Sequence, residues 1–426
     1  MRVDETRTAR SPVRNTGTDI TRRRFLADSA KSAGTGFAVW SSLAAGRVLG
    51  ANERIRVGGI GTGGRAQYLL QLTKKLPGTE LVAVCDVYEP KMLQAAQLGT
   101  SATKQYADYR ALLDNREIDV VVIGSPDHWH KQMTIDAVQA GKDVYVEKPI
   151  SHSIDEGIEM VRAVEASGRV VQTGTQQRSW EHYLLGKQIV DSGKLGQINF
   201  VYTFWYQNYS RAAAWRDSRN IQPDKLDWKK WLGSAREQPF ASEKYILWRW
   251  YWDFGGGALT DLMTHWIDVI QWYMGTPAPL TALTTGNRYI QSWDCPDTIT
   301  CVLEYPKNYT VTYNGSMASS VDDGGIEFRG TRGTLKIDRE HLAFYSEESR
   351  GVPGTNLAEP EIFVRSLGDG TRSHLANFLE CVRSRKTPTA NIRVAHEAAR
   401  ASHLGNISLR TGHRVRWNAQ QERLES

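Results

Sequence analysis

The feature of the sequence that most constrains the fold is a cluster of glycines at residues 59–64, directly after a short apolar run. The run, residues 55–60, is long enough for a buried strand, and apolar periodicity over residues 66–76 predicts a helix after the glycines. The glycines match G-x-G-x-x-G, a pattern that permits a tight turn, close approach of backbone to a pyrophosphate, and close helix–strand packing. The N–H groups at the start of that helix would face the anion. We therefore predict a dinucleotide-binding unit whose contact residues are Gly59, Gly61, Thr62, Gly63, Gly64 and Arg65.

An acidic residue after the next apolar run agrees with this interpretation. Residues 81–84 predict a second strand, and Asp86 follows Gly64 by 22 residues. This is close to the roughly 20-residue spacing of a carboxylate that binds the adenosine ribose. A carboxylate would repel a 2′-phosphate, so NAD is favoured, while Lys91 nearby leaves NADP open. The alternative is a glycine-rich turn that binds nothing.

The positive charge of the chain is concentrated in its first 50 residues. The formal net charge is +6, and residues 1–50 hold nine Arg or Lys against four acids, which leaves about +1 for the rest. The basic balance therefore gives no reason to expect nucleic acid as a partner.

The same leader contains a twin arginine, Arg22-Arg23, followed by Arg24, Phe25 and Leu26. The Gly/Ala/Ser-rich stretch after it, residues 33–48, is too short and too polar to span a bilayer. We predict that residues 1–50 are a twin-arginine export signal and leader. The protein would then fold in the cytoplasm, be exported to the periplasm or beyond, and have no stable membrane anchor. A disordered basic tail is the alternative.

Strand and helix patterns alternate over residues 51–178, which predicts a doubly wound parallel sheet of the Rossmann type and an α/β fold class. Over residues 179–426 the runs become period-two or β-rich. They predict an α+β domain with a mostly antiparallel sheet that leaves one face open, closed by helices at residues 374–383 and 393–409. Four cysteines without C-x-x-C spacing are expected to be buried thiols.

Two loops follow predicted parallel strands at the edge where doubly wound sheets bind ligands. One begins at Ser125-Pro126 and includes His130, ahead of a helix expected over residues 131–140, and the other is Glu147-Lys148-Pro149. We expect Ser125, Pro126, His130, Glu147 and Lys148 to contact the cofactor.

Glu147-Lys148-Pro149 directly after a strand, downstream of the glycine pattern, resembles the signature of the Gfo/Idh/MocA oxidoreductases. The resemblance implies an NAD(P)-dependent dehydrogenase of sugars, inositols or related polyols, with Lys148 beside the nicotinamide and the reacting hydroxyl. An ammonium there stabilises developing alkoxide and helps relay its proton. The resemblance also implies a homo-oligomer formed through the C-terminal sheet. A surface lysine after a strand is the alternative.

A second informative stretch is the triple glycine 255–257 and the helix expected after it, which carries Asp261 and His265. At i and i+4, the two side chains would project from one face. They resemble the D-x-x-x-H element of the same family, which completes a lysine–aspartate–histidine set. We expect His265 to be the general base, because imidazole titrates near neutrality, and Asp261 to orient substrate and tune its neighbours. An ordinary surface Asp–His pair is the alternative.

Further candidates are weaker, and we expect substrate contacts from Arg178, Tyr206 and Trp252. We predict no metal site, because no Cys/His/Glu cluster has ligand spacing. The predicted function is hydride transfer between a secondary hydroxyl of a small carbohydrate and tightly held NAD. The alternatives are a redox-neutral enzyme that cleaves or epimerises a glycoside through a transient keto-sugar, and a non-catalytic NAD-binding carbohydrate sensor.

Overall fold

The computed structural model describes residues 54–209, 220–347 and 359–425. The predicted export signal lies outside the described residues. No helix in these ranges combines the length and apolar character that crossing a membrane requires.

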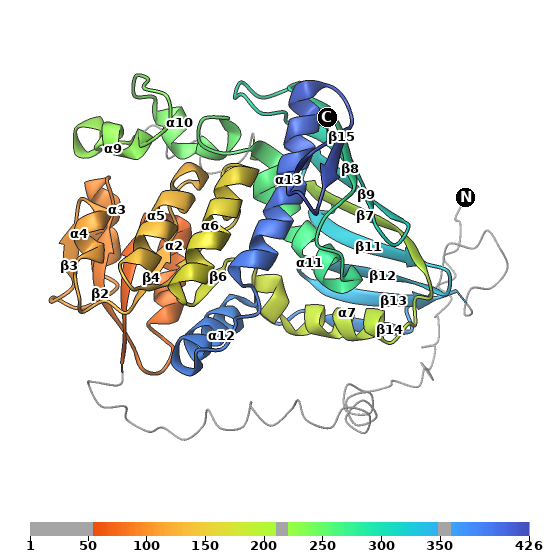
Figure 1. The fold of residues 1–426 in the computed structure, drawn as a ribbon, viewed down its shortest axis with the longest axis horizontal. Coiled ribbons are helices and arrows are strands. Elements are labelled where there is room, and N and C mark those ends of the chain that lie inside the picture. The colour runs from red at the N-terminus through yellow and green to blue at the C-terminus, as the bar shows by residue number, and fades with distance from the viewer. Residues whose placement is uncertain (1–53, 210–219, 348–358, 426) are drawn as a thin grey trace, which may run out of the picture. The chain divides into compact units, whose positions relative to one another are not determined.

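The first sheet is parallel, with strand order β3-β2-β1-β4-β5-β6 (Figure 1). Its strands are β1 (Ile55–Ile60), β2 (Thr79–Cys85), β3 (Lys104–Tyr106), β4 (Val120–Ile123), β5 (Asp143–Val146) and β6 (Val171–Thr173). β4 is buried along its whole length because helices cover both faces of the sheet, which explains the continuous apolar run. The order reverses between β1 and β4, where such sheets bind ligands. The predicted Rossmann sheet is confirmed.

Helices from both ends of the chain cover this sheet. One face packs against α2 (Gly64–Thr73), α3 (Glu89–Ala96) and α12 (Thr371–Ser384). The other packs against α4 (Tyr109–Leu113), α5 (Asp127–Gln139), α6 (Ile154–Ser167) and the first turns of α13 (Ile392–Thr411). The predicted domain boundary at residue 178 therefore does not coincide with a boundary between hydrophobic cores. Leu375, Phe378 and Leu379 of α12 belong to the core of the first sheet.

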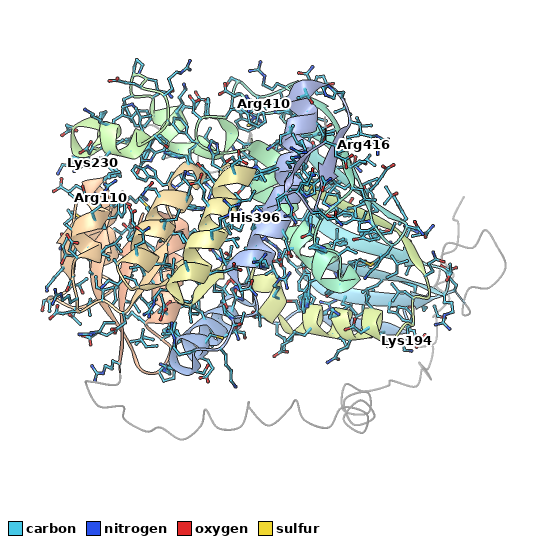
Figure 2. All side chains as sticks on the ribbon, viewed as in Figure 1. Arg110, Lys194, Lys230, His396, Arg410 and Arg416 are labelled. Atoms are coloured by element: carbon cyan, nitrogen blue, oxygen red, sulfur yellow. The ribbon has the colours of Figure 1, made fainter. Side chains whose placement is uncertain are left out.

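Packing of α13 on α6 depends on a glycine. A Cβ at Gly157 of α6 would lie 2.2 Å from Nδ1 of His396 on α13. Figure 2 labels His396 where the two helices lie side by side. This contact joins the nucleotide half of the chain to the long C-terminal helix.

The second sheet has strand order β14-β13-β12-β11-β7-β10-β9-β8-β15-β16. The strands are β7 (Ile198–Tyr206), β8 (Thr281–Asn287), β9 (Thr298–Tyr305), β10 (Tyr309–Ser316), β11 (Gly324–Gly330), β12 (Gly333–Asp338), β13 (His341–Ser346), β14 (Ile362–Arg365), β15 (Val415–Asn418) and β16 (Arg423–Leu424). Buried and half-exposed residues alternate strictly along β10, so one face is covered and one open, as expected. The sheet is mixed, because β10 pairs with β7 in parallel. Sequence patterns missed the strands β13 to β16, of which β14 and β16 form the two edges of the sheet.

Further short helices follow β6. They are η3 (Gln176–Ser179), α7 (Glu181–Asp191), η6 (Pro223–Lys225), α9 (Trp228–Leu232), α10 (Ser242–Ile246), η7 (Trp248–Trp250), the π-helical segment η8 (Leu259–Met263) and α11 (Thr264–Met274). One of them, α9, lies over the first sheet's helices, where the backbone oxygen of Trp231 accepts a hydrogen bond from Trp129 of α5 (Figure 1). All four cysteines are buried thiols, as predicted.

Candidate active site

The glycine loop between β1 and α2 forms an open cradle at the carboxyl edge of the first sheet. Gly61 has φ +68°, and a Cβ on it would lie 2.6 Å from the backbone nitrogen of Ser125. A Cβ on Gly59 would lie 2.7 Å from Leu70 of α2, so this position sets the helix–strand packing. Around Gly64 there is open space, and the start of α2 has neither a side-chain cap nor an acid in its first turn. An uncapped helix N-terminus facing open space is suited to an anion.

Asp86 follows β2 and is tied to the glycine loop. Its Oδ2 accepts a hydrogen bond from the backbone nitrogen of Thr62 at 2.7 Å, and its Oδ1 accepts one from Tyr88 at 2.9 Å. Burial raises the pKa of Asp86, and these two hydrogen bonds oppose that rise. The carboxylate lies at the strand end where ribose binding is predicted, and that role stays a prediction.

Arg65 links the glycine loop to the Lys148 loop. From the first turn of α2 its Nε lies 2.8 Å from Oε1 of Glu147. Burial alone would lower the pKa of Arg65, but the Glu147 carboxylate outweighs this and raises it. Glu147 also accepts a hydrogen bond from the backbone nitrogen of Lys148 at 3.3 Å. Both predicted cofactor residues therefore lie at the edge of the cradle.

Lys148 reaches the helix after the triple glycine. Its Nζ donates to Oδ1 of Asp261 at 2.6 Å and to the Asp261 backbone oxygen at 2.7 Å. Arg249 donates to the same Oδ1 through Nε at 3.1 Å. Burial would raise the pKa of Asp261, but the two cations more than offset it and lower the pKa. The predicted amine and acid are therefore in direct contact, across two parts of the chain 113 residues apart.

His265 lies beside this pair, but its titration differs from our expectation. Burial lowers the pKa of His265 well below its ordinary value, and the charges of Lys148, Arg339 and Arg65 lower it further. The imidazole is therefore neutral at physiological pH and does not titrate near neutrality. Its Nδ1 is buried and has no hydrogen-bond partner among the described residues. A ligand hydroxyl could supply that missing partner.

The helix between Asp261 and His265 is not a regular α-helix. Asp261 lies in the π-helical segment η8, and His265 lies in the first turn of α11. The i, i+4 argument therefore does not describe the local geometry, although both side chains remain near Lys148. π-Helical turns occur frequently at functional sites. The sequence pattern gave no sign of this one.

Sequence reasoning missed three residues around the pair. Arg249 is the second cation on Asp261. Asp127 in the first turn of α5 is 2% exposed, and burial together with the charge of Asp261 raises its pKa well above the ordinary value. Trp205 of β7 stacks on His265 with ring centroids 5.9 Å apart. Asp127 could have been found from its place after β4, whereas Arg249 lies in a Trp-rich stretch without a recognisable motif.

Two residues predicted to contact a ligand, His130 and Arg178, form hydrogen bonds to other parts of the protein. Both ring nitrogens of His130 face backbone oxygens, those of Pro149 at 2.6 Å and Ser125 at 2.9 Å. The ring of His130 thus links two loops, and its predicted cofactor contact stays a prediction. Helix α5 begins at Asp127, four residues earlier than expected. Arg178 donates to both carboxylate oxygens of Asp268 at 2.8 and 2.9 Å, which argues against a substrate contact.

The two aromatic candidates also lie away from the pair. Tyr206 shares a face of β7 with Phe204 and Tyr202, whose hydroxyl is 3.3 Å from its own. Side chains alternate along a strand, so Trp205 and not Tyr206 faces His265. Trp252 lines a different cavity, described below. No group of three or more potential metal ligands occurs in the described residues.

Two family models match the chain. The model for the "Oxidoreductase family, NAD-binding Rossmann fold" matches residues 55–175, and the model for the "Oxidoreductase family, C-terminal alpha/beta domain" matches residues 233–417. The chain belongs to the Gfo/Idh/MocA oxidoreductase family. Its two matched regions carry Lys148 and the Asp261–His265 element respectively.

Individual relatives agree with the family. The uncharacterized oxidoreductase YrbE of Bacillus subtilis is 33% identical over 293 residues, 67% of this chain and 74% of the relative. Inositol 2-dehydrogenase of Salmonella typhimurium is 32% identical over 140 residues, and the match spans only 41% of that enzyme's length. The solved structure of levoglucosan dehydrogenase in complex with NADH and levoglucosan has a TM-score of 0.69 at 17% identity, covering 85% of this chain and 99% of that one. At this identity the structural match shows a shared fold.

The site of this Gfo/Idh/MocA chain fits a dinucleotide. Besides the open cradle at Gly64, three buried polar atoms have no partner among the described residues: Ser125 Oγ, Asp127 Oδ1 and His265 Nδ1. Ser125 lies against Gly61 of the glycine loop, and Asp127 and His265 each interact electrostatically with Lys148. Buried polar atoms of folded proteins rarely stay unpaired. Unpaired buried polar atoms of this kind are expected where a polar ligand supplies the missing hydrogen-bond partners.

Proposed function

We propose that the protein catalyses NAD-dependent oxidation of a secondary hydroxyl on a cyclic polyol or sugar. The observation that carries the proposal is the contact between the Lys148 ammonium and Asp261 Oδ1 at 2.6 Å, with the unpartnered His265 beside it. An amine, a carboxylate and a neutral imidazole at one cofactor site are the groups needed to move a proton from a carbinol. Family membership supports this reaction class, and the names of the inositol and levoglucosan dehydrogenases support a cyclic polyol.

The chain's own residues would act as follows. Bound NAD⁺ would supply the hydride acceptor. Lys148 places positive charge at the carbinol oxygen and stabilises the alkoxide, and Asp261 holds the ammonium in place. His265 accepts the hydroxyl proton. Its lowered pKa makes it a weak base, so the transfer depends on Lys148 stabilising the negative charge that loss of the proton leaves on the carbinol oxygen.

We propose NAD as the physiological cofactor. Support comes from Asp86, whose carboxylate would repel a 2′-phosphate at the ribose position. Replacement Asp86→Ser should lower the KM for NADP relative to that for NAD. An unchanged ratio of the two KM values would contradict the role of Asp86.

We propose export through the twin-arginine pathway and assembly through the second sheet. Support for export is the Arg22-Arg23 pair, and Arg22→Lys/Arg23→Lys should retain the full-length chain in the cytoplasm. Support for assembly is the half-buried row Tyr202, Phe204 and Tyr206 on the open sheet face. Light scattering of Phe204→Glu should show smaller particles than the native protein if this face is the interface.

The proposed activity is tested by releasing and quantifying bound nucleotide, then incubating the protein with inositols, aldoses and glycosides, with and without added NAD. Net NADH supports the dehydrogenase. Product without net NADH would identify the redox-neutral alternative, and neither product nor NADH across the panel would leave an NAD-binding sensor.

A further inference from the structure

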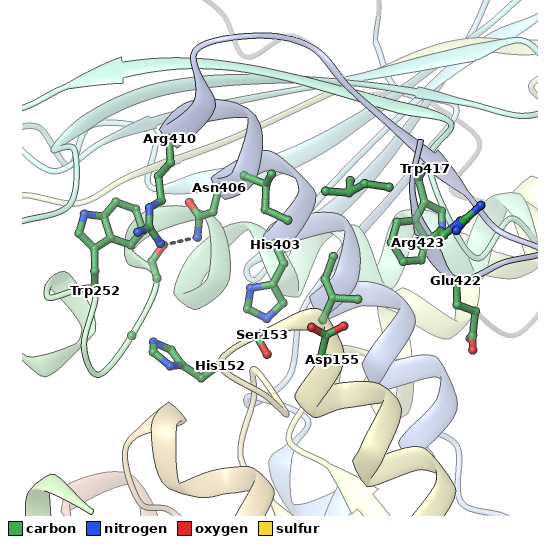
Figure 3. Close-up of a pocket in the computed structure, with 15 residues that line it drawn as sticks. His152, Ser153, Asp155, Trp252, His403, Asn406, Arg410, Trp417, Glu422 and Arg423 are labelled. Carbon is green, nitrogen blue, oxygen red and sulfur yellow. Dashed lines mark hydrogen bonds between the residues drawn. The ribbon is translucent and has the colours of Figure 1, made fainter. Parts of the chain in front are cut away.

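A second cavity of about 370 Å³ lies beside the upper end of α13, among side chains from four parts of the chain (Figure 3). Its volume is within the range of small-molecule sites. The residues with ring, amide or guanidinium groups in its wall are His152, Trp252, His403, Asn406, Arg410, Trp417 and Arg423. None of the residues that line it belongs to the glycine loop, and Lys148, Asp261 and His265 do not line it either.

Asn406 of α13 gives this cavity an unsatisfied acceptor. The side chain is 7% exposed, and its Nδ2 donates to the backbone oxygen of Gly256 at 2.8 Å. Its Oδ1 is buried and has no hydrogen-bond partner among the described residues. Leaving a buried amide oxygen unpaired costs about 1–3 kcal/mol, so a ligand that donates a hydrogen bond here would recover that energy. The Asn406 amide therefore points to a ligand with hydroxyl or N–H groups.

Aromatic surface and further polar groups surround Asn406. The Arg410 guanidinium lies over the ring of Trp252, with Cζ 5.4 Å from its centroid, and Figure 3 shows both beside Asn406. His403 uses Nε2 to contact the Ser151 backbone oxygen at 3.1 Å. Indole faces with nearby amide, imidazole and guanidinium groups form an amphipathic wall, suited to molecules with apolar C–H faces and polar edges.

The charges around the cavity give an anion no net attraction. The N-terminus of α6 borders it but is already capped, because Ser153 accepts from Glu156 and the Glu156 carboxylate accepts from His152. The wall carries two arginines, Arg410 and Arg423, against two carboxylates, Asp155 and Glu422, so its formal charges balance. A neutral ligand suits this balance better than a phosphate or a carboxylate.

We propose that this cavity is a second binding site for a neutral polyhydroxylated molecule of monosaccharide size, separate from the catalytic centre. Ring hydroxyls would donate to Asn406 Oδ1 and accept from Arg410, and an apolar ring face would pack on the indoles. The site is close to the chemistry along the chain: His152 follows Lys148 by four residues and Gly256 precedes Asp261 by five. The proposal does not depend on hydride transfer, because it concerns other residues.

The test uses full-length protein labelled with 5-fluorotryptophan and observed by ¹⁹F NMR, with the Trp252 and Trp417 signals assigned from Trp→Phe variants. Methyl β-D-glucopyranoside is titrated to about 50 mM, well above the roughly 1 mM Kd that corresponds to about −4 kcal/mol. Saturable shifts of both signals are expected. Arg410→Met should weaken this binding at least fivefold, and Asn406→Leu, which removes the acceptor, at least tenfold.

The matched control is Arg414→Met, which removes a nearby arginine that pairs with Glu304 outside the cavity and should leave the titration unchanged. Static Trp252 and Trp417 signals would overturn the proposal, as would shifts that Arg410→Met leaves unaltered, even if Asn406→Leu fails to fold. Dehydrogenase assays on the same samples report on the catalytic centre, so failure of the proposed function is seen separately.

Discussion

Two buried ion pairs connect the first sheet to the same helical segment. Lys148 follows β5 and contacts Asp261 in the π-helical turn, and Arg178 follows β6 and contacts Asp268 on α11. In both, a cation from the carboxyl edge of the parallel sheet meets a carboxylate from the second half of the chain. From the sequence we expected both cations to lie near the substrate. In the structure they contact different carboxylates, Lys148 that of Asp261 and Arg178 that of Asp268.

The two pairs differ in what else their charges can do. Asp268 is fully buried, and both of its carboxylate oxygens accept a hydrogen bond from Nε of Arg178. The Arg178 guanidinium also lies near the ring of Trp272. The two cations are almost equally buried, at 11% exposure for Lys148 and 9% for Arg178. Asp261, however, keeps 9% exposure and binds a second cation, Arg249. A sealed pair in which one Nε–H is shared by both carboxylate oxygens is a structural connection, whereas a pair at the edge of the proposed ligand site retains capacity for chemistry. The following predictions test this distinction.

The largest effect is expected at the open pair. Lys148→Ala should lower kcat by about 10²–10⁴-fold, because the alkoxide loses its stabilising charge. Nucleotide affinity should change little, because the cradle is formed by the glycine loop. Steady-state kinetics and NAD titration measure the two effects. Wild-type turnover in this variant would remove Lys148 from the catalytic set.

The sealed pair should affect stability instead. Arg178→Met leaves the Asp268 carboxylate buried without its cation and should lower the free energy of unfolding by about 3–5 kcal/mol, measured by urea denaturation. Burial raises the pKa of Asp268, against the effect of Arg178, so the ionised pair contributes little net stability.

The double variant Arg178→Met/Asp268→Leu should therefore recover most of the loss. The folded fraction of either variant should keep its kcat. A large fall in kcat with intact folding would instead return Arg178 to the substrate site.

A smaller effect is expected on stability at acidic pH, and it arises from His265, which lies beside the Lys148–Asp261 pair and not beside the Arg178–Asp268 pair. Its pKa is lowered in the folded state, so the neutral ring contributes full stability above the unfolded pKa near 6.5. As the pH falls from 6.5 to 5, His265 becomes protonated in the unfolded chain but stays neutral in the folded one. The free energy of unfolding therefore falls by up to about 2 kcal/mol. Urea unfolding at pH 7 and pH 5 should show that His265→Asn reduces this loss. The exposed His413→Asn is the control, and equal losses in both variants would contradict the prediction.

The smallest effect is expected from the second cation on Asp261. The Arg249 side chain is 37% exposed, so its contact with Asp261 is partly screened and Arg249→Met should lower kcat by about fivefold. Loss of this charge raises the pKa of Asp261, so the acidic limb of the kcat/KM profile should move to higher pH. A fall in kcat as large as that of Lys148→Ala would contradict this ranking and show that Arg249 contributes to catalysis as much as Lys148.

The comparison also shows where sequence reasoning succeeds. Periodicity and glycine spacing located the Rossmann strands and the loops that carry Glu147 and Lys148, because a parallel sheet imposes short-range patterns. The Lys148–Asp261 contact followed from resemblance. The fate of Arg178 depended on a partner 90 residues away, which no local pattern encodes. Trp205, the neighbour of Tyr206, is the residue that stacks on His265, because the alternation of side chains along a strand decides which face each one occupies, and the substrate contact of Tyr206 stays a prediction.

The titration of His265 could not be predicted for a related reason. Its lowered pKa arises from burial and from charges on three distant segments. The π-helical turn was likewise invisible, because Leu259–Met263 has the composition of an ordinary helix. Both features depend on tertiary structure alone.

The packing of α12 on the nucleotide sheet has a consequence for biosynthesis. Leu375, Phe378 and Leu379 complete the face of the sheet that α2 and α3 cover only in part, so the remainder of that face stays exposed until some 320 residues after Ile55 have been translated. We expect the nascent chain to need chaperone protection over that interval. We also expect a fragment ending near residue 178 to aggregate when expressed alone. A soluble, NAD-binding fragment of that length would show that the C-terminal helix is dispensable for forming the cofactor site.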